Sequence, residues 1–172
     1  MYLSKRKVIL VTSISALVFF FTYTDIKSQD IKITDGDTIK LNGDKIRFSG
    51  IDTPELKQTC IKDEVKILCG LNAKKILVDK IGNNKVTCVK EGKDRYKRIL
   101  AECFVNNESL SSYLVRSGYA FAYRKYSKKF IPDEEFAKSN KLGMWSMEFD
   151  YPWDWRKKKL IFNLFLNFFL IF

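Results

Sequence analysis

The chain has 172 residues, of which 46% are hydrophobic and 15% are aromatic, and this composition predicts one globular domain and excludes a disordered chain. The formal net charge is +11, but residues 28–156, with 24 basic and 19 acidic residues, contribute only +5 of it. A domain this mildly basic is compatible with a phosphate-containing ligand and does not require one.

Residues 8–23 are mostly apolar, carry no charge and follow Lys5, Arg6 and Lys7, a pattern typical of an export segment over residues 1–27. The stretch is long for a signal peptide and short for a membrane span, and no Ala-x-Ala site follows it. A cleaved signal and an uncleaved anchor therefore both stay open. Under either interpretation the positive-inside rule predicts an exported domain that is periplasmic, secreted or membrane-anchored.

Between residues 31 and 48 apolar residues alternate with polar ones, as expected for half-buried strands. The turn residues Asn42 and Gly43 predict an antiparallel hairpin between the second and third runs. Asp37 stands near the start of this hairpin and Asp52 just past its end, so pairing brings the two carboxylates together. Their hard oxygen atoms suit calcium or magnesium.

The alternative is that these acids are ordinary turn residues, since Asp, Gly and Pro are common in turns. The presence of Arg47 and Glu55 in the same stretch favours the metal site.

Residues 56–68 lack a clear period and predict a loop, and residues 71–80 predict an amphipathic helix that ends at Gly82. Residues 85–90 and 98–105 predict the arms of a second hairpin. A helix over residues 108–117, a strand over 119–123 and a helix that begins near Pro132 and ends at Gly143 complete the domain.

Four cysteines behind an export segment favour disulfides, with buried free thiols as the alternative. Cys88 and Cys103 lie symmetrically about the centre of the second hairpin, as cross-strand partners must. Their pairing also predicts Lys90 opposite Ala101 and Gly92 opposite Ile99. Cys60 would then pair with Cys69.

The C-terminal part begins with an aromatic segment over residues 151–156, here named the C-terminal strap, which we predict to be structural. Residues 157–172 form a basic and apolar tail, in which residues 160–172 are too few to span a bilayer as a helix. Two interpretations stay open. The tail lies at a membrane interface, so that residues 8–23 and 160–172 both contact lipid, or it has no selected role.

Three motifs resemble those of the staphylococcal-type thermonucleases: residues 33–41 (ITDGDTIKL), residues 47–55 (RFSGIDTPE) and residues 94–98 (DRYKR). They occur in the family's order, and the similarity extends from about Asp30 to Trp145. The chain is therefore identified as resembling an exported bacterial member of this family. The resemblance implies an α+β fold, a five-stranded OB-fold β-barrel with about three α-helices, over residues 28–156.

The resemblance also implies calcium-dependent hydrolysis of DNA and RNA by a monomer, with 3′-phosphate products. Asp37, Asp52 and the main-chain carbonyl of Thr53 would hold Ca²⁺. Glu55 would orient or deprotonate the attacking water, and Arg47 and Arg98 would bind the phosphate. The residues expected to contact substrate are Tyr96, Lys97, Tyr123 and Tyr126.

Lys97 departs from the family, in which a glycine usually precedes the second catalytic arginine. If that position needs a positive φ, a lysine there is strained and can displace Arg98.

The main rival hypothesis is an OB-fold module that binds nucleic acid without cutting it. A membrane-associated structural protein is a further rival, suggested only by the two apolar flanks. Because every expected chemical position is retained, we favour the enzyme. The absence of histidine excludes histidine-based nuclease mechanisms.

Overall fold

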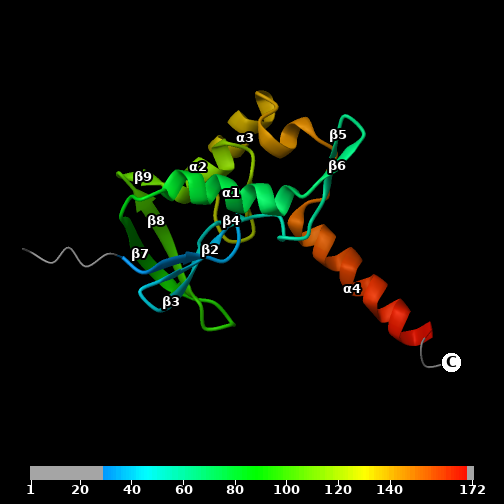
Figure 1. Cartoon of the computed structure of the whole chain (residues 1–172), viewed down its shortest axis with the longest axis horizontal. Coiled ribbons are helices and arrows are strands. Elements are labelled where there is room, and N and C mark those ends of the chain that lie inside the picture. The colour runs from blue at the N-terminus through cyan, green and yellow to red at the C-terminus, as the bar shows by residue number, and fades with distance from the viewer. Residues whose placement is uncertain (1–28, 170–172) are drawn as a thin grey trace, which may run out of the picture.

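The computed structural model describes residues 29–169, with side chains described as far as residue 162. The predicted export segment, residues 8–23 included, lies outside the described residues. Within them the chain forms a mixed β-sheet, two smaller strand pairs and four α-helices (Figure 1). The prediction of an α+β fold is confirmed.

The main sheet has the strand order β1-β2-β3-β8-β7, and β9 pairs with β8. Its strands are β1 (Ile31–Ile33), β2 (Thr38–Leu41), β3 (Asp44–Phe48), β7 (Val86–Lys93), β8 (Ile99–Val105) and β9 (Glu108–Ser109). The two smaller pairs are β4 (Ile51–Asp52) with β10 (Phe121–Ala122), and β5 (Cys60–Lys62) with β6 (Val65–Ile67). The strand pairs are antiparallel except for β3 and β8, which run parallel.

The hairpin between β2 and β3 forms as predicted. Asn42 and Gly43 have φ angles of 50° and 92°, which suit the turn that best matches strand twist. Ile39 pairs with Ile46, and both side chains are buried. This register places one face of the hairpin in the core. It leaves Asp37, which precedes β2, at the open end of the hairpin.

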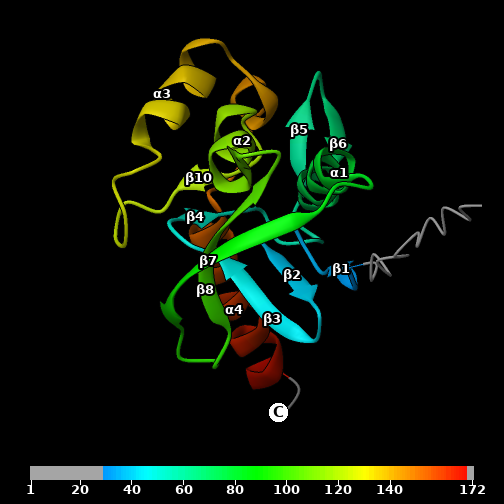
Figure 2. The ribbon, with the colours of Figure 1, turned by 90° about the vertical axis from the view of Figure 1, so that its left-hand side faces the viewer.

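The helices are α1 (Cys69–Ile81), α2 (Leu110–Arg116), α3 (Ile131–Ser139) and α4 (Pro152–Phe169), with a 3-10 turn, η1 (Gly143–Ser146). Helix α1 buries Ala73, Leu77 and Ile81, spaced by four residues, against the core. Figure 1 shows α1 running between the main sheet and the β5–β6 hairpin, and Figure 2 shows α3 at the opposite end of the molecule from the projecting end of α4.

Several elements differ from the prediction. The predicted loop over residues 56–68 contains the β5–β6 hairpin, and the helix predicted over 108–117 starts at Leu110 because Glu108–Ser109 first pairs with β8. The C-terminal strap is not a separate segment, since α4 begins at Pro152 and continues into the tail. Proline suits a first helical position, and Asp154 favours the helix N-terminus.

Among residues 29–169 no helix is both long and apolar enough to cross a bilayer.

Both predicted disulfides are present. Cys88–Cys103 joins β7 to β8, and Cys60–Cys69 joins β5 to the first residue of α1. The predicted pairing of Lys90 with Ala101 is confirmed, but Gly92 pairs with Leu100 and not with Ile99. A register shift between Lys90 and Gly92 accounts for the difference, because an extra residue in one strand moves all later partners by one.

Lys97 has a φ of 63°, in the left-handed region where a side chain is strained. We expect Lys97→Gly to raise the free energy of unfolding by about 0.5–1 kcal/mol, since glycine removes the strain and its greater freedom in the unfolded chain offsets part of the gain. Urea denaturation measures this change. The control is Lys93→Gly in β7, where φ is not positive and glycine should destabilise. A less stable Lys97→Gly protein would contradict the strain.

Candidate active site

The guanidinium of Arg47 lies between the two carboxylates that the sequence predicted to converge. Its Nη1 donates to Asp37 Oδ1 at 2.6 Å, and its Nη2 donates to Asp52 Oδ1 at 2.8 Å. The register explains this geometry, because Thr38, next to Asp37, pairs with Arg47 across β2 and β3. Asp37 and Asp52 are only 2% and 0% exposed, so they need a cation beside them to remain ionised.

Asp37 is the most perturbed acid of this site. Burial raises the pKa of its carboxyl to about 7, although the Arg47 guanidinium acts to lower this pKa. The neighbouring carboxylates of Asp35 and Asp52 also raise it, while a hydrogen bond from Thr38 Oγ1 to Asp37 Oδ1 at 3.0 Å lowers it. The site therefore carries more negative charge than Arg47 alone offsets, a condition that favours a further cation.

The donor atoms at this position fit a hard divalent cation. The carboxylates of Asp37 and Asp52 meet at one guanidinium, and the Thr53 N–H donates to Asp37 Oδ2 at 3.3 Å, which places the Thr53 peptide beside them. Oxygen ligands of this kind suit calcium. Within residues 29–169 no three acidic, histidine or cysteine side chains form a ready metal cage, so a cation here would depend on the two carboxylates and main-chain oxygen.

A second arginine from the C-terminal strap reaches the same site. Arg156 Nη2 donates to Asp52 Oδ2 at 2.7 Å, and its Nη1 donates to Glu55 Oε1 at 2.9 Å and to Asp52 Oδ1 at 3.3 Å. Although burial acts to lower it, the two carboxylates raise the pKa of Arg156, so its guanidinium is charged. We define the acidic site as Asp37, Asp52 and Glu55, held together by Arg47 and Arg156.

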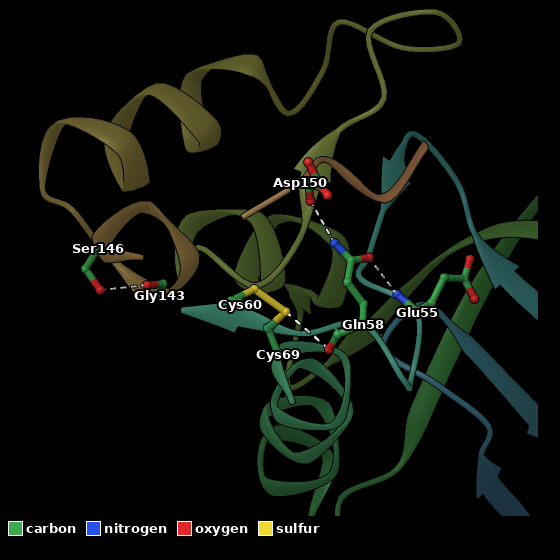
Figure 3. The surroundings of a disulfide bond; sticks show 7 residues. All are labelled: Glu55, Gln58, Cys60, Cys69, Gly143, Ser146 and Asp150. Atoms are coloured by element: carbon green, nitrogen blue, oxygen red, sulfur yellow. Dashed lines mark hydrogen bonds between the residues drawn. A yellow bond between two sulfur atoms is a disulfide. The ribbon is translucent and has the colours of Figure 1, made fainter. Parts of the chain in front are cut away.

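The main chain of Glu55 is fixed by Gln58, whose side chain is fully buried (Figure 3). Gln58 Oε1 accepts from the Glu55 N–H at 3.2 Å, and its Nε2 donates to the Asp150 carbonyl at 2.7 Å. Asp150 lies just before α4. One side chain therefore connects the loop that carries Glu55 to the segment that carries Arg156.

Helix α1 and a disulfide support the same loop. A Cβ atom at Gly70, in the first turn of α1, would lie 1.7 Å from the Glu55 carbonyl oxygen, so only glycine permits this approach. The Cys69 sulfur lies 3.4 Å from the Gln58 carbonyl oxygen and is bonded to Cys60 (Figure 3). The Cys60–Cys69 disulfide thus packs against the main chain of Gln58.

Arg98 stands at the end of the turn between β7 and β8. Its Nε donates to Asp94 Oδ2 at 2.7 Å, while Asp94 Oδ1 accepts from the main-chain N–H groups of Tyr96 and Arg98. Although burial acts to raise it, these hydrogen bonds lower the pKa of Asp94. Among the described residues no partner is assigned to the Nη atoms of Arg98, and Arg98 lines the cleft beside the acidic site.

A cleft of about 940 Å³ joins these groups. Its walls come from segments far apart in the sequence and include Asp37, Arg47, Asp52, Thr53, Glu55, Tyr96, Arg98, Tyr123, Lys125, Tyr126, Lys129 and Arg156. The arrangement places carboxylates and arginines around one open space, as required for binding a cation and a phosphate together.

The predicted substrate residues divide into two groups. Tyr96 and Tyr126 are 64% and 70% exposed and line the cleft, where Tyr123 contacts Tyr126 edge to face at 4.8 Å between ring centroids. Lys97 is not among the residues that line the cleft, and its assignment as a substrate-binding residue stays a prediction. The left-handed backbone of Lys97 belongs to the turn that positions Arg98, so Lys97 also acts on the site through that turn.

Comparison with known proteins agrees with this geometry. The family model described as "Staphylococcal nuclease homologue" matches residues 45–147, which is more than half of the chain. The chain belongs to this family. The family match and its endonuclease relatives support a nuclease, a hydrolase of phosphodiester bonds.

Three relatives illustrate the range of the family. An uncharacterized endonuclease of Haemophilus influenzae is 29% identical over 91% of this chain and 88% of its own length. The SPbeta prophage-derived endonuclease YokF of Bacillus subtilis is 33% identical over 67% of this chain and 42% of its own length. A probable staphylococcal-like nuclease of rice, Oryza sativa, is 30% identical over 66% of this chain and 28% of its own length.

Sequence reasoning found Asp37, Arg47 and Asp52 in this nuclease but missed Gln58 and Arg156. Arg156 lies outside the three sequence motifs, in the C-terminal strap that was predicted to be structural. One signal was available in the sequence. An arginine within an aromatic segment that is expected to pack against the domain needs an anionic partner there.

We expect Gln58→Met to lower the free energy of unfolding by about 1–3 kcal/mol, because it leaves the partly buried Glu55 N–H and Asp150 carbonyl without their partner. The catalytic rate should also fall about tenfold or more, since Glu55 loses its support. Urea denaturation and a nuclease assay measure the two effects.

The matched control is Gln29→Met. Gln29 also forms two hydrogen bonds to a main chain, to the N–H and carbonyl of Val86, but neither residue lines the cleft. The Gln29→Met protein should have a lower free energy of unfolding and an unchanged catalytic rate. An unchanged rate in Gln58→Met would contradict the positioning role.

Proposed function

We propose that this nuclease is calcium-dependent, cleaves both DNA and RNA, and leaves 3′-phosphate ends. The observation that carries the proposal is the cleft, where the acidic site faces Arg98 from a separate hairpin. The family membership supports the nuclease chemistry.

Arg98 and Arg47 act on the phosphate in different ways. Arg98 is turned by Asp94 so that its Nε is occupied, which leaves its Nη atoms to bind phosphate oxygens. Arg47 already bonds Asp37 and Asp52, so it orders the acidic site and stabilises charge beside the scissile phosphate. A planar fork of N–H donors matches the oxyanion that develops during phosphodiester hydrolysis.

Glu55 acts on water. Its side chain is 43% exposed and lies at the cleft, while Gln58 fixes its main chain. A carboxylate held in this way can orient a water or accept its proton. Asp37, Asp52 and the Thr53 carbonyl would hold Ca²⁺, which when bound supplies positive charge to the phosphate oxygens.

The exposed tyrosines Tyr96 and Tyr126, with Tyr123, provide ring faces and edges for bases or sugars on either side of the scissile bond. None of these groups requires a 2′-hydroxyl, which supports activity on both DNA and RNA. The chain contains no histidine, so the proposed reaction depends on arginine, carboxylate and cation alone.

We also propose that the enzyme is exported. All four cysteines are paired in disulfides, which form and persist in oxidising compartments. At the other end of the chain, Leu160, Ile161 and Phe162 are more than half exposed next to three lysines, which supports contact of α4 with an anionic membrane surface.

The test uses the full chain, purified in mild detergent because its ends are apolar. Plasmid DNA and single-stranded RNA are incubated with calcium and then with chelator. We expect cleavage of both substrates only with calcium, and DNA ends that a polymerase extends only after phosphatase treatment. Equal cleavage in chelator, or ends that are extended directly, would overturn the corresponding part of the proposal.

Arg98→Lys should lower the rate by at least about 100-fold, since a single ammonium cannot replace a fork of donors facing an oxyanion. The control is Arg116→Lys on α2, where the arginine is exposed and lies 3.5 Å from Asp133 outside the cleft. Steady-state rates on plasmid DNA compare the two. A rate within tenfold of wild type in Arg98→Lys, with normal calcium affinity, would remove Arg98 from the phosphate site.

The three acids should separate by role. Asp37→Asn and Asp52→Asn should weaken calcium affinity and rate together, because both residues are assigned as direct ligands. Glu55→Gln should lower the rate more than the affinity, because Glu55 is assigned to water. Calorimetric titration with calcium, beside the rate assay, measures both quantities. Unchanged calcium affinity in both Asp variants would refute the metal assignment.

A further inference from the structure

Arg156 occupies oxygen atoms of Asp52 that a metal ligand must present. Its two Nη atoms contact both carboxylate oxygens of Asp52, at 2.7 and 3.3 Å, and one of them also contacts Glu55 at 2.9 Å. Arg47 adds a third contact, to Asp52 Oδ1. Both oxygens of this buried carboxylate are therefore bonded to guanidinium groups.

The position of Arg156 is set by packing at the start of α4. The ring of Trp153 stacks on Tyr151 at 4.7 Å and is parallel to Tyr123 at 5.8 Å between centroids. Residues three apart share one face of a helix, so the side chain of Arg156 projects beside that of Trp153. The hydrogen bond from Gln58 to the Asp150 carbonyl fixes the residue just before Tyr151.

The charges of the acidic site are nearly balanced by these arginines alone. Asp37, Asp52 and Glu55 carry three negative charges when ionised, and Arg47 and Arg156 carry two positive ones. The arginines differ in accessibility, because the side chain of Arg47 is 19% exposed and that of Arg156 is 39% exposed. Arg156 is thus the partner that can leave more easily for solvent.

We propose that Arg156 is an internal counter-ion that competes with the divalent cation for Asp52 and is displaced when the cation binds. This inference rests on the proposed calcium site. Without metal, Arg156 holds Asp52 and Glu55 in place and limits the repulsion between them. With metal, its bond to Asp52 is given up, and the guanidinium keeps Glu55 as its neighbour in the cleft.

Competition and simple support predict opposite results when Arg156 is removed. If Arg156 competes with the cation, its removal strengthens metal binding and weakens the metal-free protein. If Arg156 only supports the shape of the site, its removal weakens metal binding or leaves it unchanged.

The test is Arg156→Gln in the full chain, with Arg116→Gln as the control. Arg116 also pairs with an aspartate at a half-exposed position, but on α2 and outside the cleft. Calorimetry with calcium chloride gives the affinity, and thermal unfolding in chelator and in calcium gives Tm. We expect Arg156→Gln to bind calcium about tenfold more tightly, to melt lower in chelator and to gain more Tm on calcium addition, whereas Arg116→Gln should match wild type in calcium affinity.

Wild-type protein gives a second measurement that does not depend on the folding of a variant. In chelator the NMR signals of the Arg156 guanidinium should show hindered rotation, because both Nη atoms are bonded, and calcium should reduce the hindrance by freeing Nη2. Calcium affinity equal to or weaker than wild type in Arg156→Gln, or guanidinium signals unaffected by calcium, would overturn the proposal. If wild type binds no calcium, the proposed metal site fails first and the competition fails with it.

Discussion

The bridge between Asp37 and Asp52 through Arg47 is the interaction on which the site depends. Two carboxylates this deeply buried are unfavourable unless a cation lies between them, and Arg47 supplies that charge from the open end of the hairpin that brings them together. Because β3 runs parallel to β8, Arg47 also lies opposite Leu100, two residues from Arg98. One strand therefore orders the acids and places the second hairpin beside them.

The C-terminal strap, residues 151–156, packs against the rest of the domain and contacts the acidic site. Gln58 connects it to the Glu55 loop through a hydrogen bond to Asp150. The ring of Trp153 lies parallel to that of Tyr123, and Arg156 bonds to the acidic site. A domain boundary drawn on sequence at residue 156 falls inside α4, directly after the residue that makes this contact. The arrangement explains why an aromatic segment carries a charged residue, since the rings fix the direction in which the guanidinium points.

Local patterns predicted the parts of the site that local structure controls. The period of two, the Asn42–Gly43 turn and the motif order located Asp37, Arg47 and Asp52, and hairpin symmetry located the Cys88–Cys103 bond. The predicted strand pairing was wrong at Gly92, because a bulge in β7 has no periodic signal in the sequence. Gln58 and Arg156 were missed because their partners Asp150 and Asp52 lie 92 and 104 residues away in the chain, and no spacing rule encodes such contacts.

The contact between Asp52 and Arg156 spans 104 residues, which has a consequence for the order in which the site is made. Synthesis proceeds from the N-terminus, and contacts of large sequence separation form late in folding. A ribosome has therefore already completed the residues of β2, β3 and β8 when it reaches Arg156. Any nascent or truncated chain that stops earlier presents Asp52 and Glu55 with one arginine fewer, so synthesis through Arg156 is a condition for the charge balance of this nuclease.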